Sequence, residues 1–295
     1  MLSGIEKIIF IILALICSFM AYVTFSRMFG VISSGTQPLS LSQILSNWRN
    51  GVYSFISQKT LFKTRPIIGL IHALVAWGFT LYLVVNIIDV LYGFIPGFRF
   101  LPNHLFGHLY RVFVDVFSVL VLVGVFYFLY RRFIQKDQKL KIEKPVMLSE
   151  SAIKGMRYDS MIVGFFIIIH VGARFLSASF EIAHAGPDST QPFANLIAKL
   201  WINMEPRSII FMEHVTWWIA LGLILLFLPY FPLSKHAHLF MGPINIMGKE
   251  VRKSMGALEK IDFEDDTIEQ FGSSRLHHLP QNQLLDGYAC IQCSR

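Results

Sequence analysis

The sequence predicts an all-α membrane protein, a bundle of five transmembrane helices with its N-terminus outside and its C-terminus in the cytoplasm. Apolar residues make up 54% of the 295 residues and charged residues only 15%, and the mean hydropathy is +0.53. A soluble domain carries about 25% charged residues. The apolar residues also cluster in runs of about 20, the length that crosses a bilayer as a helix. This composition argues against a water-soluble domain and against a disordered chain.

The apolar runs give the expected positions of the spans. They are residues 5–29, 66–92, 104–130, 158–184 and 206–228. The second and fifth are expected to begin at Pro66 and Pro206, because proline is favoured in the first turn of a helix. The first run has one lysine near its start, Lys7, and no small-residue cleavage site. We interpret it as a retained helix rather than a signal peptide.

Lysine and arginine alternate between the loops. Residues 27–65 contain five and residues 131–157 contain eight, whereas residues 93–104 contain one and residues 182–207 contain two. Because positively charged loops stay in the cytoplasm, the first and third loops are expected there. The net charge of +7 is then a signal of membrane orientation, and no nucleic-acid partner is expected.

Polar side chains follow the third and fourth spans at helical spacing. In the third span they are His104, His108, Arg111 and Asp115. In the fourth span they are His170, Arg174, Ser177, Glu181 and His184. Intervals of three and four residues put each set on one helical face, and ionisable side chains in a membrane face the bundle interior or a polar cavity. His214 of the fifth span lies in the same outer half. These two polar stripes indicate either a cofactor or quinone site or an interhelical salt-bridge network. In the second case the pairs would be Arg111–Asp115 and Arg174–Glu181, with the histidines filling hydrogen bonds.

Two further histidine segments lie toward the inner side. His72 is early in the second span, with Gly69 three residues before it and Ala76 four after it. Small neighbours let a flat macrocycle approach, and neutral imidazole is an axial ligand of haem iron. The alternative is a histidine that is hydrogen-bonded to a neighbouring helix. At the end of the fifth span, His236 and His238 are two residues apart, so at most one of them points inward.

Cys290 and Cys293 form a C-x-x-C pair at the end of the sequence. A single pair leaves zinc, a redox couple and an iron–sulfur cluster open. The pair matches the first two cysteines of the bacterial ferredoxin run, whose third cysteine would fall beyond Arg295. We interpret the sequence as the membrane part of a longer polypeptide. A [4Fe-4S] cluster is expected only if the chain continues beyond Arg295.

These features together resemble the membrane cytochrome b, or gamma, subunit of respiratory nitrate reductases. They resemble still more the related cytochrome b domain of heterodisulfide-reductase-type oxidoreductases, which is fused to a ferredoxin-type iron–sulfur domain. The resemblance rests on the five spans, His72, the Trp217-Trp218 pair, residues 230–238 and residues 288–293. It implies a transmembrane cytochrome b domain at 1–240, a cytoplasmic linker or helix at 241–284 and the truncated start of an iron–sulfur domain at 285–295.

The resemblance implies one or two haems b. One lies near the cytoplasmic face with His72 and His238 as axial ligands. The sequence departs from the family pattern at Tyr82, where a histidine is expected. His214 is also further from His238 than in the family. An outer haem is therefore expected to use His214 with either His170 or His108. Two further residues, Arg111 and Arg174, are expected to pair with haem propionates.

The implied function is electron transfer between the quinone pool, menaquinone or ubiquinone, and a cytoplasmic iron–sulfur or disulfide-reductase-type subunit. The chain would be an electron-transfer subunit or domain of a quinone-linked oxidoreductase, in the cytoplasmic membrane of a bacterium or archaeon, with no catalytic residue of its own. The quinone is expected near His104, Arg111, Glu181 and His184. Two alternatives are a haem-free membrane anchor or proton pathway and a truncated gene product without activity.

Overall fold

The described part of the chain is helical. The computed structural model describes residues 2–102, 104–140, 148–249, 264 and 272–290. Within these ranges the elements are α-helices and short 3-10 and π turns, with one isolated β-bridge between Thr36 and Pro280 and no strand. The all-α prediction is confirmed for these residues.

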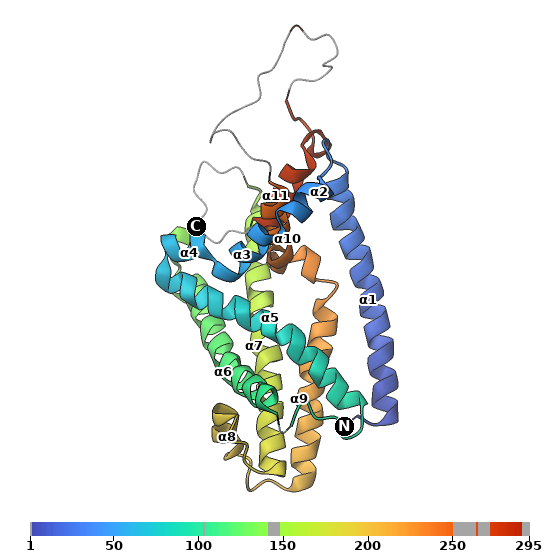
Figure 1. Cartoon of the computed structure of the whole chain (residues 1–295), viewed down its shortest axis with the longest axis vertical. Coiled ribbons are helices and arrows are strands. Elements are labelled where there is room, and N and C mark those ends of the chain that lie inside the picture. The colour runs from blue at the N-terminus through green and yellow to red at the C-terminus, as the bar shows by residue number, and fades with distance from the viewer. Residues whose placement is uncertain (1, 103, 141–147, 250–263, 265–271, 291–295) are drawn as a thin grey trace. The chain divides into compact units, whose positions relative to one another are not determined.

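Five helices are long and apolar enough to cross a membrane, as predicted (Figure 1). They are α1 (Gly4–Ser33), α5 (Pro66–Phe94), α6 (Leu105–Leu129, followed by a π-turn at Tyr130–Ile134), α7 (Glu150–Ala185) and α9 (Pro206–Phe227). The orientation of the termini stays a prediction.

Local sequence signals set the ends of these helices. Pro66 and Pro206 occupy the first turns of α5 and α9. In the first turn an N–H has no acceptor within the helix, so the missing N–H of proline costs no hydrogen bond. α7 begins eight residues before the expected position, because Ser149 caps it: its hydroxyl accepts a hydrogen bond from the Ala152 N–H at 3.2 Å. It ends at Gly186, whose φ of +102° favours glycine.

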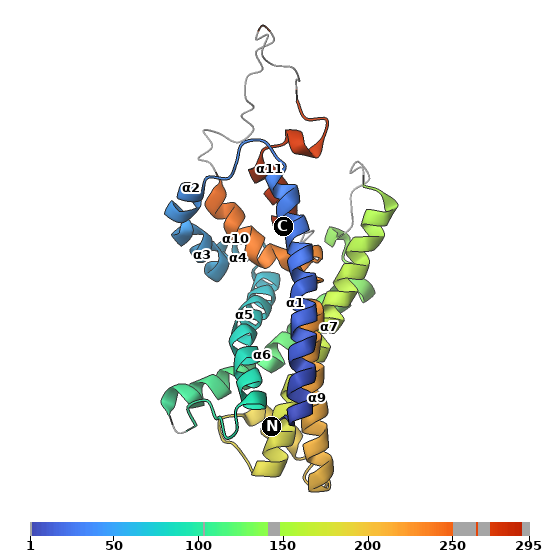
Figure 2. The same ribbon diagram turned by 90° about the vertical axis from the view of Figure 1, so that its right-hand side faces the viewer.

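The described chain divides into two compact units. The first comprises Met1–Ala21 and Thr60–Tyr230, and the second comprises Tyr22–Lys59 and Phe231–Cys293. In the first unit α7 and α9 run side by side (Figure 2). Glycines bring neighbouring helices close: a Cβ on Gly124 of α6 would lie 2.7 Å from Val75 of α5, and one on Gly164 of α7 would lie 2.6 Å from Leu129 of α6. Small residues serve membrane helix interfaces in this way.

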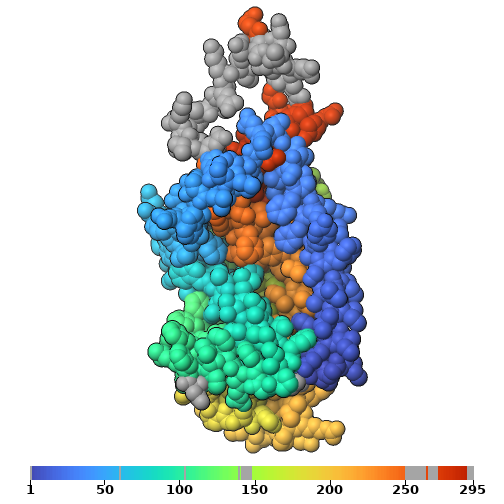
Figure 3. Space-filling model, turned by 45° about the vertical axis from the view of Figure 1, so that its right-hand side comes forward, coloured from blue at the N-terminus to red at the C-terminus, as the bar shows by residue number. Residues whose placement is uncertain are grey.

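The beginning of α1 packs against the end of α5. The Leu2 N–H donates to the Gly93 carbonyl at 3.0 Å, and the Lys7 ammonium donates to the Phe94 carbonyl at 2.9 Å. The rings of Phe10 and Phe94 meet edge to face at 5.6 Å. Figure 3 shows this part of α1, in dark blue, beside the turquoise α5. These contacts hold the first turns of α1 in the first unit.

The second unit contains the later part of α1 and four short helices. These are α2 (Leu41–Ser46), α3 (Trp48–Ser57), α10 (His238–Gly248) and α11 (Gln281–Ala289). Its apolar core contains Met28, Ile32, Ala237, Met241 and Leu285. Residues before the C-x-x-C pair are thus helical and packed. The predicted boundaries at 240 and 284 stay predictions, and nearly all of residues 249–270 lie outside the described part.

Candidate functional site

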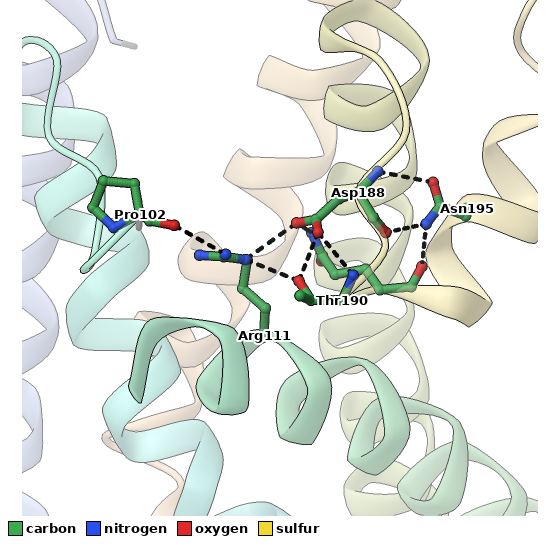
Figure 4. A network of polar contacts seen from close by, with 6 residues as sticks. Pro102, Arg111, Asp188, Thr190 and Asn195 are labelled. Atoms are coloured by element: carbon green, nitrogen blue, oxygen red, sulfur yellow. Dashed lines mark hydrogen bonds and ion pairs between the residues drawn. The ribbon is translucent and has the colours of Figure 1, made fainter. Parts of the chain in front are cut away.

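The polar stripe of α6 is tied to the loop that follows α7. The Nε of Arg111 lies 3.1 Å from Oδ2 of Asp188 and donates to the Thr190 hydroxyl at 3.0 Å. Its Nη2 donates to the Pro102 carbonyl at 3.2 Å (Figure 4). Burial raises the pKa of the Asp188 carboxyl, but hydrogen bonds from Thr190 and Gln191 and the charge of Arg111 outweigh it, so this pKa is lowered. Asp188, rather than Asp115, is the acidic partner of Arg111.

Asp115 caps the short helix α8 (Pro192–Ala198). Its carboxylate is 2% exposed and accepts the N–H of Phe193 at 2.8 Å and the N–H of Ala194 at 2.9 Å. This carboxylate satisfies two of the N–H groups that a helix start leaves unpaired. Asp115 therefore connects α6 to α8, while the other end of the α6 stripe, His104 and His108, is exposed.

Arg174 of the second stripe pairs with an acid that the sequence reasoning did not single out. Its Nε lies 3.1 Å from Oδ2 of Asp89 on α5, and its Nη2 lies 3.4 Å from Oδ1. The side chains are 16% and 14% exposed. Glu181, the partner considered from spacing, is exposed. Asp89 could have been found, because it is the one acidic residue within the second expected span and such residues are costly in a membrane.

His170 is a buried histidine whose two ring nitrogens have different surroundings. The residue is 3% exposed, and its Nδ1 lies 2.8 Å from the Ala220 carbonyl of α9. Because a carbonyl only accepts, Nδ1 carries the proton and Nε2 keeps its lone pair. Nε2 is buried and has no hydrogen-bond partner among the residues that the structure describes. Phe166 stacks on the ring at 5.6 Å, and the Tyr82 ring meets it edge-on at the same distance. An orphaned buried nitrogen in this tautomer fits axial ligation of haem iron.

His214 lies on another side of α9. Its Nδ1 is 3.1 Å from Oε1 of Glu6 on α1, and the Trp218 indole N–H donates to the same oxygen at 3.0 Å. His170 and His214 thus have separate partners, and the described contacts do not bring them together. Of the three residues considered for an outer haem, His170, His214 and His108, only His170 is buried.

His72 and His238 belong to different units, so each is described alone. The His72 ring meets Phe128 of α6 at 6.4 Å. The glycine surface at Gly69, expected to face a macrocycle, packs on α4 (Lys59–Thr64): a Cβ there would lie 3.2 Å from the Leu61 backbone.

His238 Nδ1 is hydrogen-bonded to the Lys235 carbonyl, which again leaves Nε2 as the lone-pair nitrogen. Burial, followed by the charges of His238 and Lys235, lowers the pKa of His236 to about 3. His236 is therefore neutral near pH 7.

The structure describes one cysteine of the C-x-x-C pair. Cys290 is exposed, and Cys293 lies outside the described residues. Among the residues that are described, no group of three or more His, Cys, Asp or Glu side chains is placed to hold a metal ion. The roles given to Cys290 and Cys293 stay predictions.

Comparison with known proteins gives two relatives. The chain is 33% identical over 247 residues to the probable iron-sulfur-binding oxidoreductase FadF of Bacillus subtilis (strain 168), a match that covers 81% of this chain and 32% of the relative. It is 25% identical over 252 residues to the EtfAB:quinone oxidoreductase of Syntrophomonas wolfei subsp. wolfei (strain DSM 2245B / Goettingen), covering 84% of this chain and 34% of that protein. No protein-family model and no solved structure matches the chain.

The chain thus spans about a third of the length of these curated relatives. Over most of its own length it is homologous to a part of iron–sulfur-binding and quinone-linked oxidoreductases.

Proposed function

We propose that this chain carries electrons across a membrane, through b-type haem, between a quinone and an iron–sulfur module on the cytoplasmic side. The observation that carries the proposal is the buried, unpartnered Nε2 of His170, whose Nδ1 lies 2.8 Å from the Ala220 carbonyl. The names of the two relatives, an iron-sulfur-binding oxidoreductase and a quinone oxidoreductase, support the two ends of this route.

The residues of this chain would bind and orient the haem. His72 and His238 are the proposed axial pair toward the cytoplasm, and His170 is the proposed ligand further along the bundle. When bound, haem iron supplies a reversible one-electron redox couple. The side chains around His170 exclude water, since Phe166 and Tyr82 cover its ring. Arg174 is held by Asp89, so a propionate would have to share that guanidinium.

The first test is the haem content of the purified chain. A pyridine haemochromogen assay and a reduced-minus-oxidised spectrum are expected to show haem b. His170→Ala should reduce the haem-to-protein ratio, and His72→Ala should remove the haem that it shares with His238. His277→Ala is a matched control, because His277 is exposed and lies in the short 3-10 turn at Leu276–His278. A colourless chain from cells supplied with haem would refute the proposal, as would normal spectra in both variants.

A haem-free proton pathway is the second candidate. Within the described part of the chain, Asn86 Oδ1 and Tyr110 Oη are buried without hydrogen-bond partners, and the Asp89–Arg174 pair lies within the same helical bundle. Unpaired polar atoms of this kind can hold water. This function predicts a colourless protein whose proton flux in liposomes falls when Asp89 is replaced by Asn.

A further inference from the structure

A groove follows α9 where this helix meets the start of α1. Its volume is about 560 Å³ and its lining includes Glu6, Arg207, Phe211, His214, Trp218 and Ile219. Both helix segments belong to the first unit. From Arg207 to Ile219 the lining extends over 12 residues, about 18 Å at the helical rise. It is an elongated, mostly apolar surface with one polar cluster along it.

The polar cluster is centred on the Glu6 carboxylate. Oε1 is 3.1 Å from Nδ1 of His214 and accepts the Trp218 indole N–H at 3.0 Å. Oε2 accepts the Ser3 backbone N–H at 2.8 Å. Phe10, one α1 turn further, packs on the Trp218 ring at 5.9 Å. The carboxylate is thus fixed from both helices, and it fixes the imidazole in turn.

This arrangement gives His214 a defined chemistry. A carboxylate beside Nδ1 favours the proton on that nitrogen, which leaves Nε2 as a hydrogen-bond acceptor. A ligand hydroxyl can therefore donate a hydrogen bond to Nε2.

The apolar side chains that line the groove favour a lipid-soluble ligand. Phe211 is 66% exposed and Ile219 is 38% exposed, and both lie on a helix apolar enough to span the membrane. A ligand that approaches from the hydrocarbon region would meet apolar side chains before it reached the polar cluster. No second histidine and no cysteine line the groove among the described residues, so a haem with two protein ligands does not fit there.

We propose that this groove binds the head group of a quinone or quinol, with His214 as the hydrogen-bonding residue and Glu6 as the residue that positions it. A quinol joins an aromatic ring, a hydroxyl donor and an apolar tail, which match Trp218, Nε2 of His214 and the exposed apolar side chains. This proposal rests on the proposed function and moves the quinone away from the α6 and α7 stripes. It also gives His214 a role other than haem ligation.

Photoaffinity labelling tests the site directly. The purified full chain in lipid nanodiscs is illuminated with an azido-benzoquinone and, separately, an azido-naphthoquinone that carry short isoprenoid tails. Labelled peptides are mapped by mass spectrometry, and unlabelled quinone is titrated as a competitor. Saturable labelling is expected on α9 around His214 or on the first turns of α1. His214→Gln and Glu6→Gln should each weaken binding about tenfold, which corresponds to about 1.4 kcal/mol.

Two further variants keep the test independent of folding defects. Glu213→Gln removes a carboxylate from the neighbouring position of α9, outside the groove lining, and should leave binding unchanged. Ile219→Trp adds bulk at an exposed lining position and should weaken binding while the thermal unfolding midpoint stays the same.

The outcomes separate this proposal from the function on which it rests. Labelling near His104, Arg111, Glu181 or His184, or a His214→Gln chain with wild-type affinity, would overturn the groove. Labelling that phospholipid but not quinone displaces would assign the groove to lipid and would also overturn it, as would the absence of saturable labelling with either probe. Haem spectra are recorded on the same samples: a colourless chain that still binds quinone here would refute only the haem route.

Discussion

The buried ion pair between α5 and α7 gives the sharpest stability prediction. Asp89 and Arg174 meet through two nitrogen–oxygen contacts of 3.1 and 3.4 Å and are 14% and 16% exposed. Asp89→Asn keeps the shape of the side chain but removes its charge. Breaking a buried pair by removing one partner costs about 3–5 kcal/mol, because the remaining charge is left uncompensated. Because both side chains keep some exposure, the free energy of unfolding is expected to fall by an amount near the lower end of this range.

An exposed pair on α7 is the matched control. Lys154 and Glu150 lie 3.6 Å apart, four residues from each other, and are 70% and 89% exposed. Glu150→Gln removes the same charge as Asp89→Asn, but an exposed pair contributes only about 0.3–0.5 kcal/mol. Reversible unfolding in mixed detergent micelles, followed by circular dichroism, measures both variants. If Asp89→Asn lost no more stability than Glu150→Gln, the proposed strength of the buried pair would be refuted.

Two other carboxylates give predictions of their own. Asp115→Asn should destabilise the chain by about 1–3 kcal/mol, because at least one of the N–H groups of Phe193 and Ala194 loses its acceptor; faster hydrogen exchange at these two amides is the measurement. The pKa of Asp188 is lowered from 3.8, so its stabilising effect is complete above that value and is lost as the pH falls through the lower, folded-state pKa. Thermal melting is measured at a series of acidic pH values. Below about pH 4 the melting temperature should fall less for Asp188→Asn than for the unmodified chain.

The five spans were predictable because the signals for each helix lie within its own stretch of sequence or directly beside it. A run of apolar residues, a proline at the first turn of α5 or α9 and a charged stretch after the run are enough to place a helix. The predicted start of α7 was eight residues too late, because Glu150, Ser151, Lys154 and Arg157 interrupt the apolar run, whereas the helix begins after the Ser149 cap. The short helices of the second unit were missed for a related reason. Their stability comes from contacts with residues far along the sequence, such as the Asn245 amide with the Asp286 carboxylate at 2.6 Å.

The polar partners were less predictable than the polar residues. Spacing indicated that Arg111 and Arg174 lie on helical faces directed away from lipid. It also suggested Asp115 and Glu181, which lie four and seven residues further along the same helices, as their partners. In the structure the partners are Asp188, from a loop, and Asp89, from another helix. Acids on the same helical face compete with acids from other segments for each arginine. Which acid forms the pair depends on how the helices pack, and spacing within one helix does not determine that packing.

The histidines show why a residue type alone does not assign a role. In the sequence, His170 and His214 are both intramembrane histidines, and either could be a haem ligand. The surroundings of each imidazole ring distinguish the two histidines. The Ala220 carbonyl is neutral, so it orients the His170 ring and leaves Nε2 as a lone pair for a metal. The Glu6 carboxylate orients the His214 ring in the same way, but this imidazole lines the groove, so its Nε2 can accept a hydrogen bond from a ligand hydroxyl. We therefore propose haem ligation for the first environment and quinol binding for the second, and exchanging Glu6 for Gln should impair only the second.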